Sequence, residues 1–213
     1  EGTKADDIDE TEARVIIAGF GRFGQIIGRL LFANGINAVV LDHDPDQIEM
    51  LRKFGYKVFY GDAARIDLLH AAGAAEATLI VNAVDDIEDN LLLTDIVKEN
   101  FPKLKMIARA RNVTHFIELR ARGVEIIERE SFEAALKAGR HTLELLGFEP
   151  FRARDMANIF RRHNISAMES LIPAFKDEAS RVSAVKIGRD ELDALFARDR
   201  EQFESEHSSK GWH

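Results

Sequence analysis

The stretch Val15-Ile16-Ile17-Ala18-Gly19-Phe20-Gly21-Arg22-Phe23-Gly24 decides the fold of this chain. A short apolar run, typical of a buried strand, leads into glycines spaced G-x-G-x-x-G, and a helical pattern follows at once. In that context the motif is the fingerprint of a dinucleotide-binding turn. Gly19 allows the sharp turn, Gly21 lets a phosphate approach the backbone, and Gly24 lets the helix pack on the strand. The alternative is a glycine-rich turn that binds nothing.

Composition excludes several classes of function. The 213 residues suffice for one domain with an appendage or for two small domains, and 46% of them are hydrophobic, enough for an ordinary core. A net charge of −8 argues against nucleic acid as a main partner, because phosphate binding needs a basic face. Without cysteine the chain has no disulfide, thiol nucleophile or thiolate metal site. The sequence shows no signal-peptide pattern and no apolar run long enough to span a bilayer, so we expect neither within these residues.

From residue 14 onward, apolar runs alternate with helical patterns. Six runs predict strands at Val15–Ala18, Ala38–Leu41, Lys57–Tyr60, Thr78–Val81, Lys105–Ala108 and Val124–Ile127. The stretches between them predict five helices, at Phe23–Asn34, Asp46–Phe54, Arg65–Ala72, Glu88–Asn100 and Val113–Arg122. Asp44-Pro45 and Asp85-Asp86 precede two of these helices and fit helix caps. Such alternation, with strands apolar on both faces, predicts an α/β fold with a doubly wound, Rossmann-like, six-stranded parallel sheet.

The pattern changes after Arg129. Two helices are predicted, Ser131–Leu146 with Ser131 as N-cap, and Phe151–His163 opened by Pro150. This helical subdomain has too few residues for a core of its own, so we expect it to pack on a partner. The predicted organisation is a linker at 1–13, a nucleotide-binding domain at 14–130, the helical subdomain at 131–175, and a charged helical arm or tail at 176–213.

Polar residues that follow the predicted strands are candidates for nucleotide contacts, because ligands bind at the carboxyl edge of doubly wound sheets. Asp42 stands 18 residues after Gly24, at the position where a carboxylate accepts hydrogen bonds from a ribose. Asp42 also fits a helix cap, although Asp44 already fits that role. The full candidate set is Gly19, Gly21, Arg22, Phe23, Gly24, Asp42, His43, Gly61, Asp62, Ala63, Asn82, Val84 and Arg109.

Four of these candidates have distinct expected roles. Asp62 is placed to approach an adenine amine, Asn82 and Val84 to border adenine and ribose, and Arg109 to face the phosphates. Each also fits a plain loop or capping role. Arg22 fits a phosphate contact, an interface contact or a solvated arginine equally well.

Catalytic and metal-binding patterns are missing. Neither Tyr56 nor Tyr60 has a lysine four residues on, so the Tyr-x-x-x-Lys pair of short-chain dehydrogenases is absent. The seven histidines form no His-x-x-x-His pair, and Asp42-His43-Asp44 lacks the spacing of a metal site. The sequence therefore predicts no catalytic residue and no metal ligand, and favours binding without turnover.

Four segments resemble one known family: 15–25 (VIIAGFGRFGQ), 41–46 (LDHDPD), 51–63 (LRKFGYKVFYGDA) and 107–111 (IARAR). They are similar to the cytosolic KTN/RCK domain of the Kef glutathione-gated potassium efflux systems, of the KefC-like type. The resemblance covers about residues 14–175 and is most specific in 15–63.

The resemblance implies a regulatory domain and not an enzyme. It implies a homodimer that binds AMP, or NAD or NADH, in the glycine-motif cleft and glutathione or a glutathione S-conjugate near the dimer interface. Free glutathione would hold potassium–proton antiport shut and electrophile adducts would open it. The implied partners are a membrane antiporter domain of the same parent chain, at the cytoplasmic face of the bacterial inner membrane, and in some members an ancillary flavoprotein oxidoreductase.

By the same resemblance, glutathione contacts fall on Arg129, Asn164 and Arg29, with Phe54 as the wall that a bulky S-substituent displaces. Arginines can clamp the two glutathione carboxylates, and an asparagine amide can satisfy a peptide group. A buried arginine at position 29 would need an anionic partner. Arg129 also fits an ion pair with Glu128 or Glu130, and Asn164 a helix C-cap.

Two other functions stay open on the sequence alone. One is a small NAD-dependent oxidoreductase, with His43 as its acid or base. The other is a nucleotide-binding scaffold whose helical arm only dimerises. Asp42 suits AMP, ADP and NAD alike, so the sequence leaves the nucleotide undetermined.

Overall fold

The computed structural model describes residues 15–171, 197, 200 and 201. The chain divides into two compact units, Glu1–Ala110 with Arg122–Glu128, and Arg111–Ala121 with Arg129–His213. The predicted linker at 1–13 lies outside the described residues, as does the predicted arm at 176–213 apart from residues 197, 200 and 201. Among the helices that are described, none is long and apolar enough to cross a membrane.

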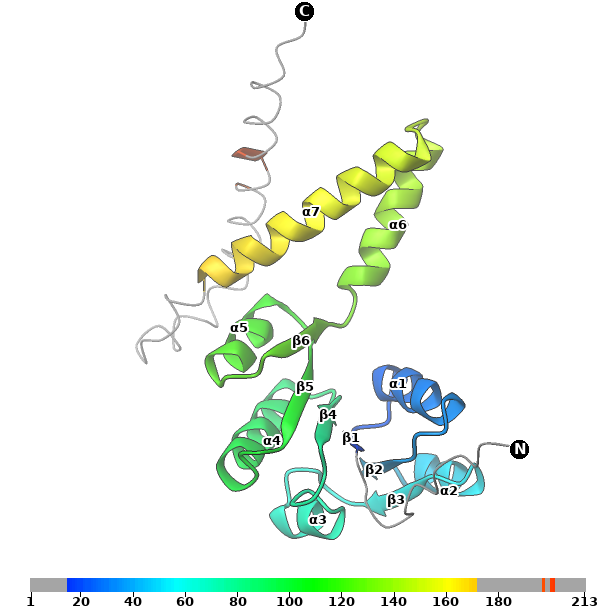
Figure 1. Cartoon of the computed structure of the whole chain (residues 1–213), viewed down its shortest axis with the longest axis vertical. Helices are drawn as coiled ribbons and strands as arrows, with labels where there is room; N and C mark the ends of the chain where they lie inside the picture. The colour runs from blue at the N-terminus through cyan, green and yellow to red at the C-terminus, as the bar shows by residue number, and fades with distance from the viewer. Residues whose placement is uncertain (1–14, 172–196, 198–199, 202–213) are drawn as a thin grey trace, which may run out of the picture. The chain divides into compact units, whose positions relative to one another are not determined.

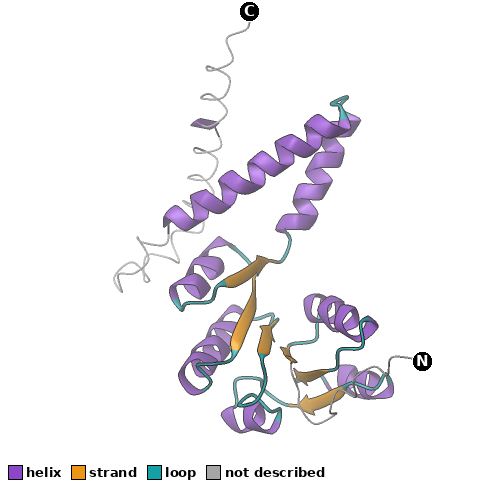
Figure 2. Cartoon of the chain, viewed as in Figure 1, coloured by secondary structure: helices purple, strands orange, loops and turns teal. Residues whose placement is uncertain are grey.

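A six-stranded sheet forms the first unit (Figures 1 and 2). Its strands are β1 (Val15–Ala18), β2 (Ala38–Asp42), β3 (Lys57–Tyr60), β4 (Leu79–Asn82), β5 (Lys105–Ala110) and β6 (Ile126–Arg129). The spatial order is β3-β2-β1-β4-β5-β6, and the ladders that join β3 to β2, β2 to β1, β1 to β4 and β4 to β5 are all parallel. The predicted doubly wound sheet is confirmed, and its order reverses between β1 and β4, where such folds bind ligands.

The helices of this unit begin and end where the sequence signals place them. They are α1 (Arg22–Ala33), α2 (Pro45–Lys53), α3 (Ile66–Ala71) and α4 (Ile87–Asn100), each within two residues of its prediction. Asp44 caps α2 by accepting from the Asp46 and Gln47 amides, and Asp86 caps α4 by accepting from those of Glu88 and Asp89. Both aspartate caps are therefore confirmed.

The core of the sheet lies on its central strands. All four residues of β1 and all five of β2 are buried, and Ile16 and Ile17 are fully enclosed. Burial of both faces explains why these strands are continuously apolar. A buried polar network joins β4 to α4: the Asn82 Nδ2 donates to the Thr94 Oγ1 at 3.0 Å and to the Asn90 carbonyl at 2.8 Å.

Three helices with defined bounds belong to the second unit: α5 (Val113–Ala121), α6 (Phe132–Leu145) and α7 (Pro150–Leu171). Both α5 and α6 contact α7. The prediction that the last helix ends at His163 is wrong. No glycine or proline stands between His163 and Pro173, and Ala153, Asn164 and Met168 share one buried stripe.

The start of α6 also differs in detail from its prediction. Ser131 does occupy the N-cap position, but its side chain makes no capping hydrogen bond. Its backbone carbonyl still accepts from the Ala135 amide at 2.9 Å. Its φ of −110° and ψ of −10° are not the extended values typical of a capping serine, which explains the missing contact.

Loss of the Thr94 hydroxyl should destabilise the first unit. The Thr94→Val variant keeps the side-chain shape but removes one acceptor of the Asn82 amide and the 2.9 Å bond to the Asn90 carbonyl. We expect the free energy of unfolding to fall by about 1–2 kcal/mol, measured by urea denaturation, because the loss occurs in a dry site.

Thr142→Val is the matched control. The Thr142 hydroxyl makes the same bond to the carbonyl four residues earlier, Ala138, at 3.0 Å, but on an exposed helix face. Water replaces that bond, so the change should stay within about 0.5 kcal/mol. Equal losses in the two variants would show that burial of the network is not what stabilises it.

Candidate functional site

The glycine turn after β1 is held by backbone contacts too close for any side chain. Gly19 has φ +84°, and a Cβ built on it would lie 2.9 Å from the Ala83 carbonyl. A Cβ on Gly24 would lie 2.2 Å from the Gly19 carbonyl oxygen. The Gly19 amide also donates to the Leu41 carbonyl at 2.9 Å. The turn is therefore fixed between the ends of β2 and β4, as the motif predicts.

Gly21 differs from its two neighbours. A Cβ built on it would meet nothing within 4 Å, and its φ of −66° is open to any residue. The fold therefore does not require glycine here, whereas a phosphate that approaches the backbone does. Gly21 is also the N-cap of α1, so no side chain caps the helix. The first turn of α1 also contains no acidic residue. This leaves the positive end of the helix dipole available to an anion.

Asp42 braces the same turn. Its side chain is buried; Oδ2 accepts from the Phe20 amide at 2.6 Å and Oδ1 from the Asp44 amide at 2.8 Å. An ionised carboxylate has about four acceptor sites, so two bonds leave capacity for ribose hydroxyls. The capping role belongs to Asp44, and His43 between them is exposed. Ribose binding by Asp42 stays a prediction.

Asn82 has a structural role, and its contact with adenine or ribose stays a prediction. This side chain is fully buried, and its amide donates into the network with α4. Its Oδ1 accepts from the Val84 amide at 3.4 Å. Asn82 therefore holds the loop after β4 in place, and half-buried Val84 has the more accessible side chain of the two.

Arg109 is nearly buried at the carboxyl end of β5. One of its terminal nitrogens lies 2.6 Å from the Asp85 carboxylate, and the other donates to the Ala83 carbonyl at 3.4 Å. Its guanidinium also lies 5.8 Å from the centre of the Phe23 ring. The structure thus brings Arg109 and Phe23 together beside the glycine turn. A role for Arg109 toward phosphates stays a prediction.

Three further candidates follow β3. The Gly61 amide donates to the Asp42 carbonyl at 2.9 Å, which ties this loop to β2. Asp62 is exposed, and its Oδ1 accepts from the Ala64 amide at 2.8 Å, while Ala63 is buried. Asp62 can therefore offer its second carboxylate oxygen to a ligand. Contact with adenine stays a prediction.

Arg129 and Asn164 meet within the second unit. An Arg129 terminal nitrogen donates to the Asn164 Oδ1, and the guanidinium lies 3.7 Å from the centre of the Phe132 ring. Burial lowers the pKa of Arg129, and the nearby Glu133 charge partly opposes this. Asn164 lies inside α7, so it is not a C-cap. The pair is a half-buried polar clamp formed by residues 35 positions apart.

Arg29 and Phe54 belong to the first unit, whereas Arg129 and Asn164 belong to the second. Contrary to expectation, Arg29 is exposed, on the outer face of α1 beside Ile26, Leu30 and Phe32. Because its guanidinium reaches solvent from this largely apolar exposed face, it does not need an internal counter-ion. Phe54 caps the C-terminus of α2 with 65% of its surface exposed.

Sequence reasoning missed two contributors, Asp85 and Phe132. Asp85 was assigned only to the helix-capping turn, and it pairs with Arg109. Phe132 stacks against Arg129 three residues earlier and against Phe160 at 6.5 Å between ring centres. The spacing of three residues between Arg129 and Phe132 could have indicated this cation–π contact. Within the described residues, no group of three or more acidic or histidine side chains could hold a metal ion.

A doubly wound sheet with this glycine turn defines a nucleotide-binding class of domain, followed here by a helical subdomain. Residues 15–129 match the TrkA-N domain model, and residues 134–211 match the model of the potassium efflux system KefB C-terminal domain. The chain belongs to the TrkA-N domain family, in its KefC-like branch.

Relatives in Escherichia coli O139:H28 and Shigella boydii serotype 18 support this placement. Each is a glutathione-regulated potassium-efflux system protein KefC, 56% identical to this chain over 201 residues. The match covers 94% of this chain but only 32% of each relative. The chain therefore spans about a third of the length of these curated relatives.

Solved structures agree with the fold. A Shewanella denitrificans Kef CTD in AMP-bound form is 41% identical with a TM-score of 0.70, covering 75% of this chain and 98% of that one. The GsuK channel bound to NAD is 25% identical with a TM-score of 0.53, covering 62% of this chain and 23% of that one. The TrkA-N domain of ybaL from Escherichia coli, at 24% identity and TM-score 0.56, covers 63% of this chain and 96% of that one, and supports the fold alone.

The two motif glycines should respond differently to alanine. Gly24→Ala places a methyl group into the Gly19 carbonyl, so we expect the free energy of unfolding to fall by about 1–3 kcal/mol. Gly21→Ala places it in open space and should lower the free energy of unfolding by at most about 1 kcal/mol, through the poorer N-cap alone. Thermal and urea unfolding of the two variants measures the difference. A large loss in Gly21→Ala would contradict the open space at Gly21.

Proposed function

We propose that this chain is a ligand-sensing regulatory domain of a KefC-type potassium efflux system. The observation that carries the proposal is the 56% identity to KefC along 94% of the chain. The domain binds a nucleotide at the glycine turn and glutathione or its S-conjugates at the second unit, and it carries out no turnover. No feature of the site favours the oxidoreductase alternative, since His43, its candidate acid or base, stands exposed in the turn after β2.

The nucleotide is AMP, with NAD or NADH as the alternatives. The solved Kef CTD relative is an AMP-bound form, and the GsuK relative is bound to NAD. Gly21 and the start of α1 receive the phosphate, Asp42 the ribose, and the loops after β3 and β4 the adenine. Asp42 also disfavours a 2′-phosphate, because its buried carboxylate would repel one.

Glutathione is held by Arg129 and Asn164; Arg29 and Phe54, which the family resemblance also implicates, lie in the first unit. The name of the KefC relatives, glutathione-regulated, motivates the ligand. The chemistry fits because a partly desolvated guanidinium binds a carboxylate strongly, and the Asn164 amide is presented beside it. Free glutathione inhibits potassium efflux and its S-conjugates activate it. The bulky S-substituent of a conjugate displaces exposed Phe54, so glutathione and its conjugates have different affinities for two conformations of the domain.

The assembly in this proposal is a homodimer joined to the membrane antiporter domain of the same parent chain, on the cytoplasmic face of the bacterial inner membrane. An exposed apolar face on α1 supports dimerisation, since Ile26 is 68% exposed and Leu30 64%. An ancillary flavoprotein oxidoreductase is a further partner in the branch of the family that uses one.

Calorimetric titration with AMP tests the nucleotide site. Gly21→Ala should weaken AMP binding at least tenfold, about 1.4 kcal/mol, because the methyl group occupies the space a phosphate needs. Since the same variant is expected to stay folded, the loss would report on binding alone. Unchanged AMP affinity in a folded Gly21→Ala protein would place the phosphate elsewhere.

Titration with glutathione and with an S-alkyl adduct, at saturating AMP, tests the second ligand. Arg129→Gln should weaken both at least tenfold and leave AMP affinity unchanged, because a charged hydrogen bond is worth about 1.5–3 kcal/mol. Arg152→Gln, on an exposed face of α7, is the control with the same loss of charge. If both variants bound glutathione equally well, the clamp would not be its site; if neither ligand bound the native protein, only a nucleotide-binding domain would remain.

A further inference from the structure

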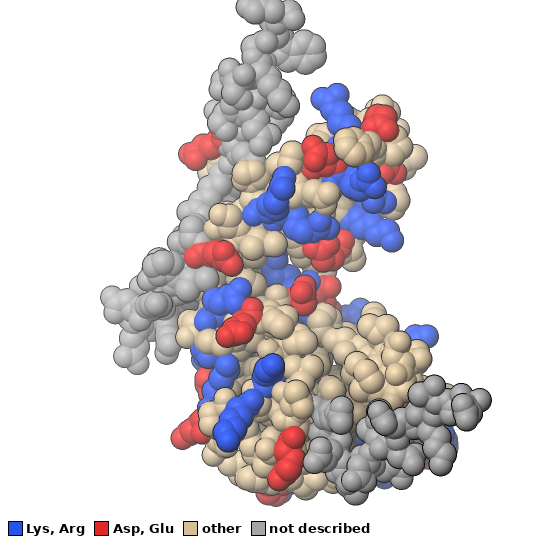
Figure 3. Space-filling view, in the orientation of Figure 1, with Lys and Arg blue, Asp and Glu red and all other residues tan. Residues whose placement is uncertain are grey.

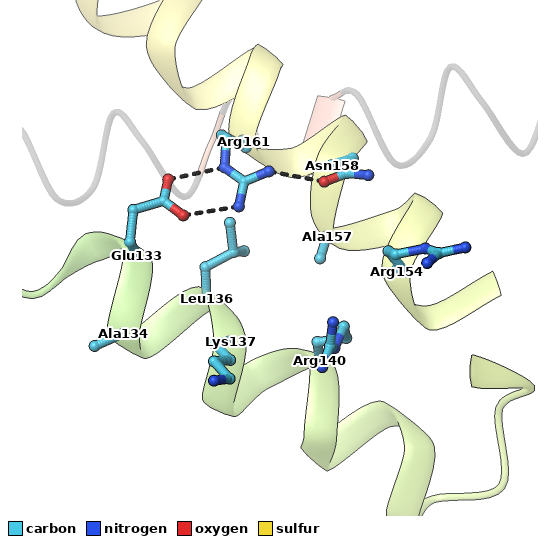
Figure 4. A pocket seen from close by; sticks show the side chains of 9 residues that line it. All are labelled: Glu133, Ala134, Leu136, Lys137, Arg140, Arg154, Ala157, Asn158 and Arg161. Atoms are coloured by element: carbon cyan, nitrogen blue, oxygen red, sulfur yellow. Dashed lines mark hydrogen bonds and ion pairs between the residues drawn. The ribbon is translucent and has the colours of Figure 1, made fainter. Parts of the chain in front are cut away.

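A groove of about 410 Å³ lies between α6 and α7, entirely within the second unit (Figure 4). Its apolar lining consists of Ala134, Leu136 and Ala157. Two of these three side chains are single methyl groups, so the helices leave space between them where larger residues would fill it. The volume is sufficient for a small molecule.

The rest of the groove is lined by charge. Four cationic side chains, Lys137, Arg140, Arg154 and Arg161, share it with one carboxylate, Glu133. The chain as a whole has a net charge of −8, so this cluster does not reflect a basic composition. The space-filling view shows Lys and Arg side chains gathered over the surface that α6 and α7 form (Figure 3).

The single carboxylate is already committed. Glu133 accepts two hydrogen bonds from Arg161, at 2.7 and 2.8 Å, and Arg161 also donates to the Asn158 Oδ1 at 2.7 Å. Hydrogen bonding to Arg161 lowers the pKa of Glu133, so this carboxylate is ionised at neutral pH. The pair is a neutral unit at one end of the groove (Figure 4).

The other three cations are weakly compensated. Arg140 has one carboxylate nearby, with its Nε 3.4 Å from a Glu144 oxygen. Neither Lys137 nor Arg154 forms an ion pair with any residue that the structure describes. Lys137 and Arg140 are three residues apart on one face of α6, which places their Cβ atoms about 5–6 Å from each other. Arg154 faces the same space from α7.

We infer that the groove binds a small phosphate-bearing polyanion, a di- or triphosphate group, through Lys137, Arg140 and Arg154. Three like charges around one hollow repel one another, and a multivalent anion removes that repulsion. Arginine offers a planar fork that matches phosphate oxygens, and lysine adds a point charge. A di- or triphosphate carries more charge than a single carboxylate and spreads its oxygens over several phosphate groups, so it can meet cations from both helices at once.

This site goes beyond the proposed nucleotide and glutathione sites. Its lining residues all belong to the second unit, and the glycine turn belongs to the first. Arg129 and Asn164 do not line it. A polyphosphate ligand would therefore bind at a separate site and would not compete with AMP.

Calorimetric titration of the native protein with inorganic tripolyphosphate, at saturating AMP, tests the inference. AMP occupies the glycine turn, so any remaining binding reports on another site. We expect saturable binding of one tripolyphosphate per chain, with inorganic phosphate binding at least tenfold more weakly. Absence of saturable binding would overturn the inference. The inference would also be overturned if a second copy of the chain fills the groove. In that case tripolyphosphate would not bind, and substitution of the groove residues Lys137 and Arg154 would change the oligomeric state.

Two double variants locate the site. Lys137→Gln with Arg154→Gln removes two groove charges and should weaken tripolyphosphate binding at least tenfold. Arg152→Gln with Arg162→Gln removes two charges from exposed positions on α7 that do not line the groove, and should change affinity less than twofold. Equal weakening in both would show diffuse attraction to basic helices and overturn the site. Circular dichroism melting of both double variants, and their unchanged AMP affinity, confirm that they are folded.

Discussion

The close approach of backbone to backbone at Gly19 and Gly24 is the constraint on which the first unit depends. Helix α1 can follow β1 directly only because the Gly24 α-carbon lies against the Gly19 carbonyl, where a methyl group would sit 2.2 Å away. The same turn lies against the end of β4 at Ala83 and is braced by the buried Asp42 carboxylate. The strand order reverses at this point, so the constraint that fixes the fold also positions the candidate nucleotide site.

Polar groups divide between the two tasks of holding the scaffold and meeting a ligand. The Asn82 side-chain amide donates hydrogen bonds to residues of α4 and so holds the loop after β4 in place. Asp42 keeps acceptor capacity after bracing the turn, and Gly21 keeps open space. In the second unit, Glu133 and Arg161 neutralise each other, whereas Lys137 and Arg154 leave their charge at the groove. Function in this domain therefore depends on the groups that folding has not already used.

Local sequence signals accounted for the elements and for much of the candidate site. The aspartates at positions 44 and 86 marked helix starts because a short carboxylate reaches the next amides. They could not show that Asn82 points inward or that Arg29 points outward, since both orientations depend on what packs against them. The end of α7 was misplaced because the buried stripe through Asn164 and Met168, not a stop signal, extends the helix.

By itself the sequence determined the doubly wound sheet, the glycine turn and the family, because backbone sterics and the period of burial act over a few residues and are written locally. Only the tertiary structure decided that Arg129 bonds to Asn164, that Asp85 pairs with Arg109, and that the space between α6 and α7 is lined by cations. These contacts join residues 24 to 35 positions apart or on separate helices. Their geometry is set by how the elements pack, and no local pattern encodes it.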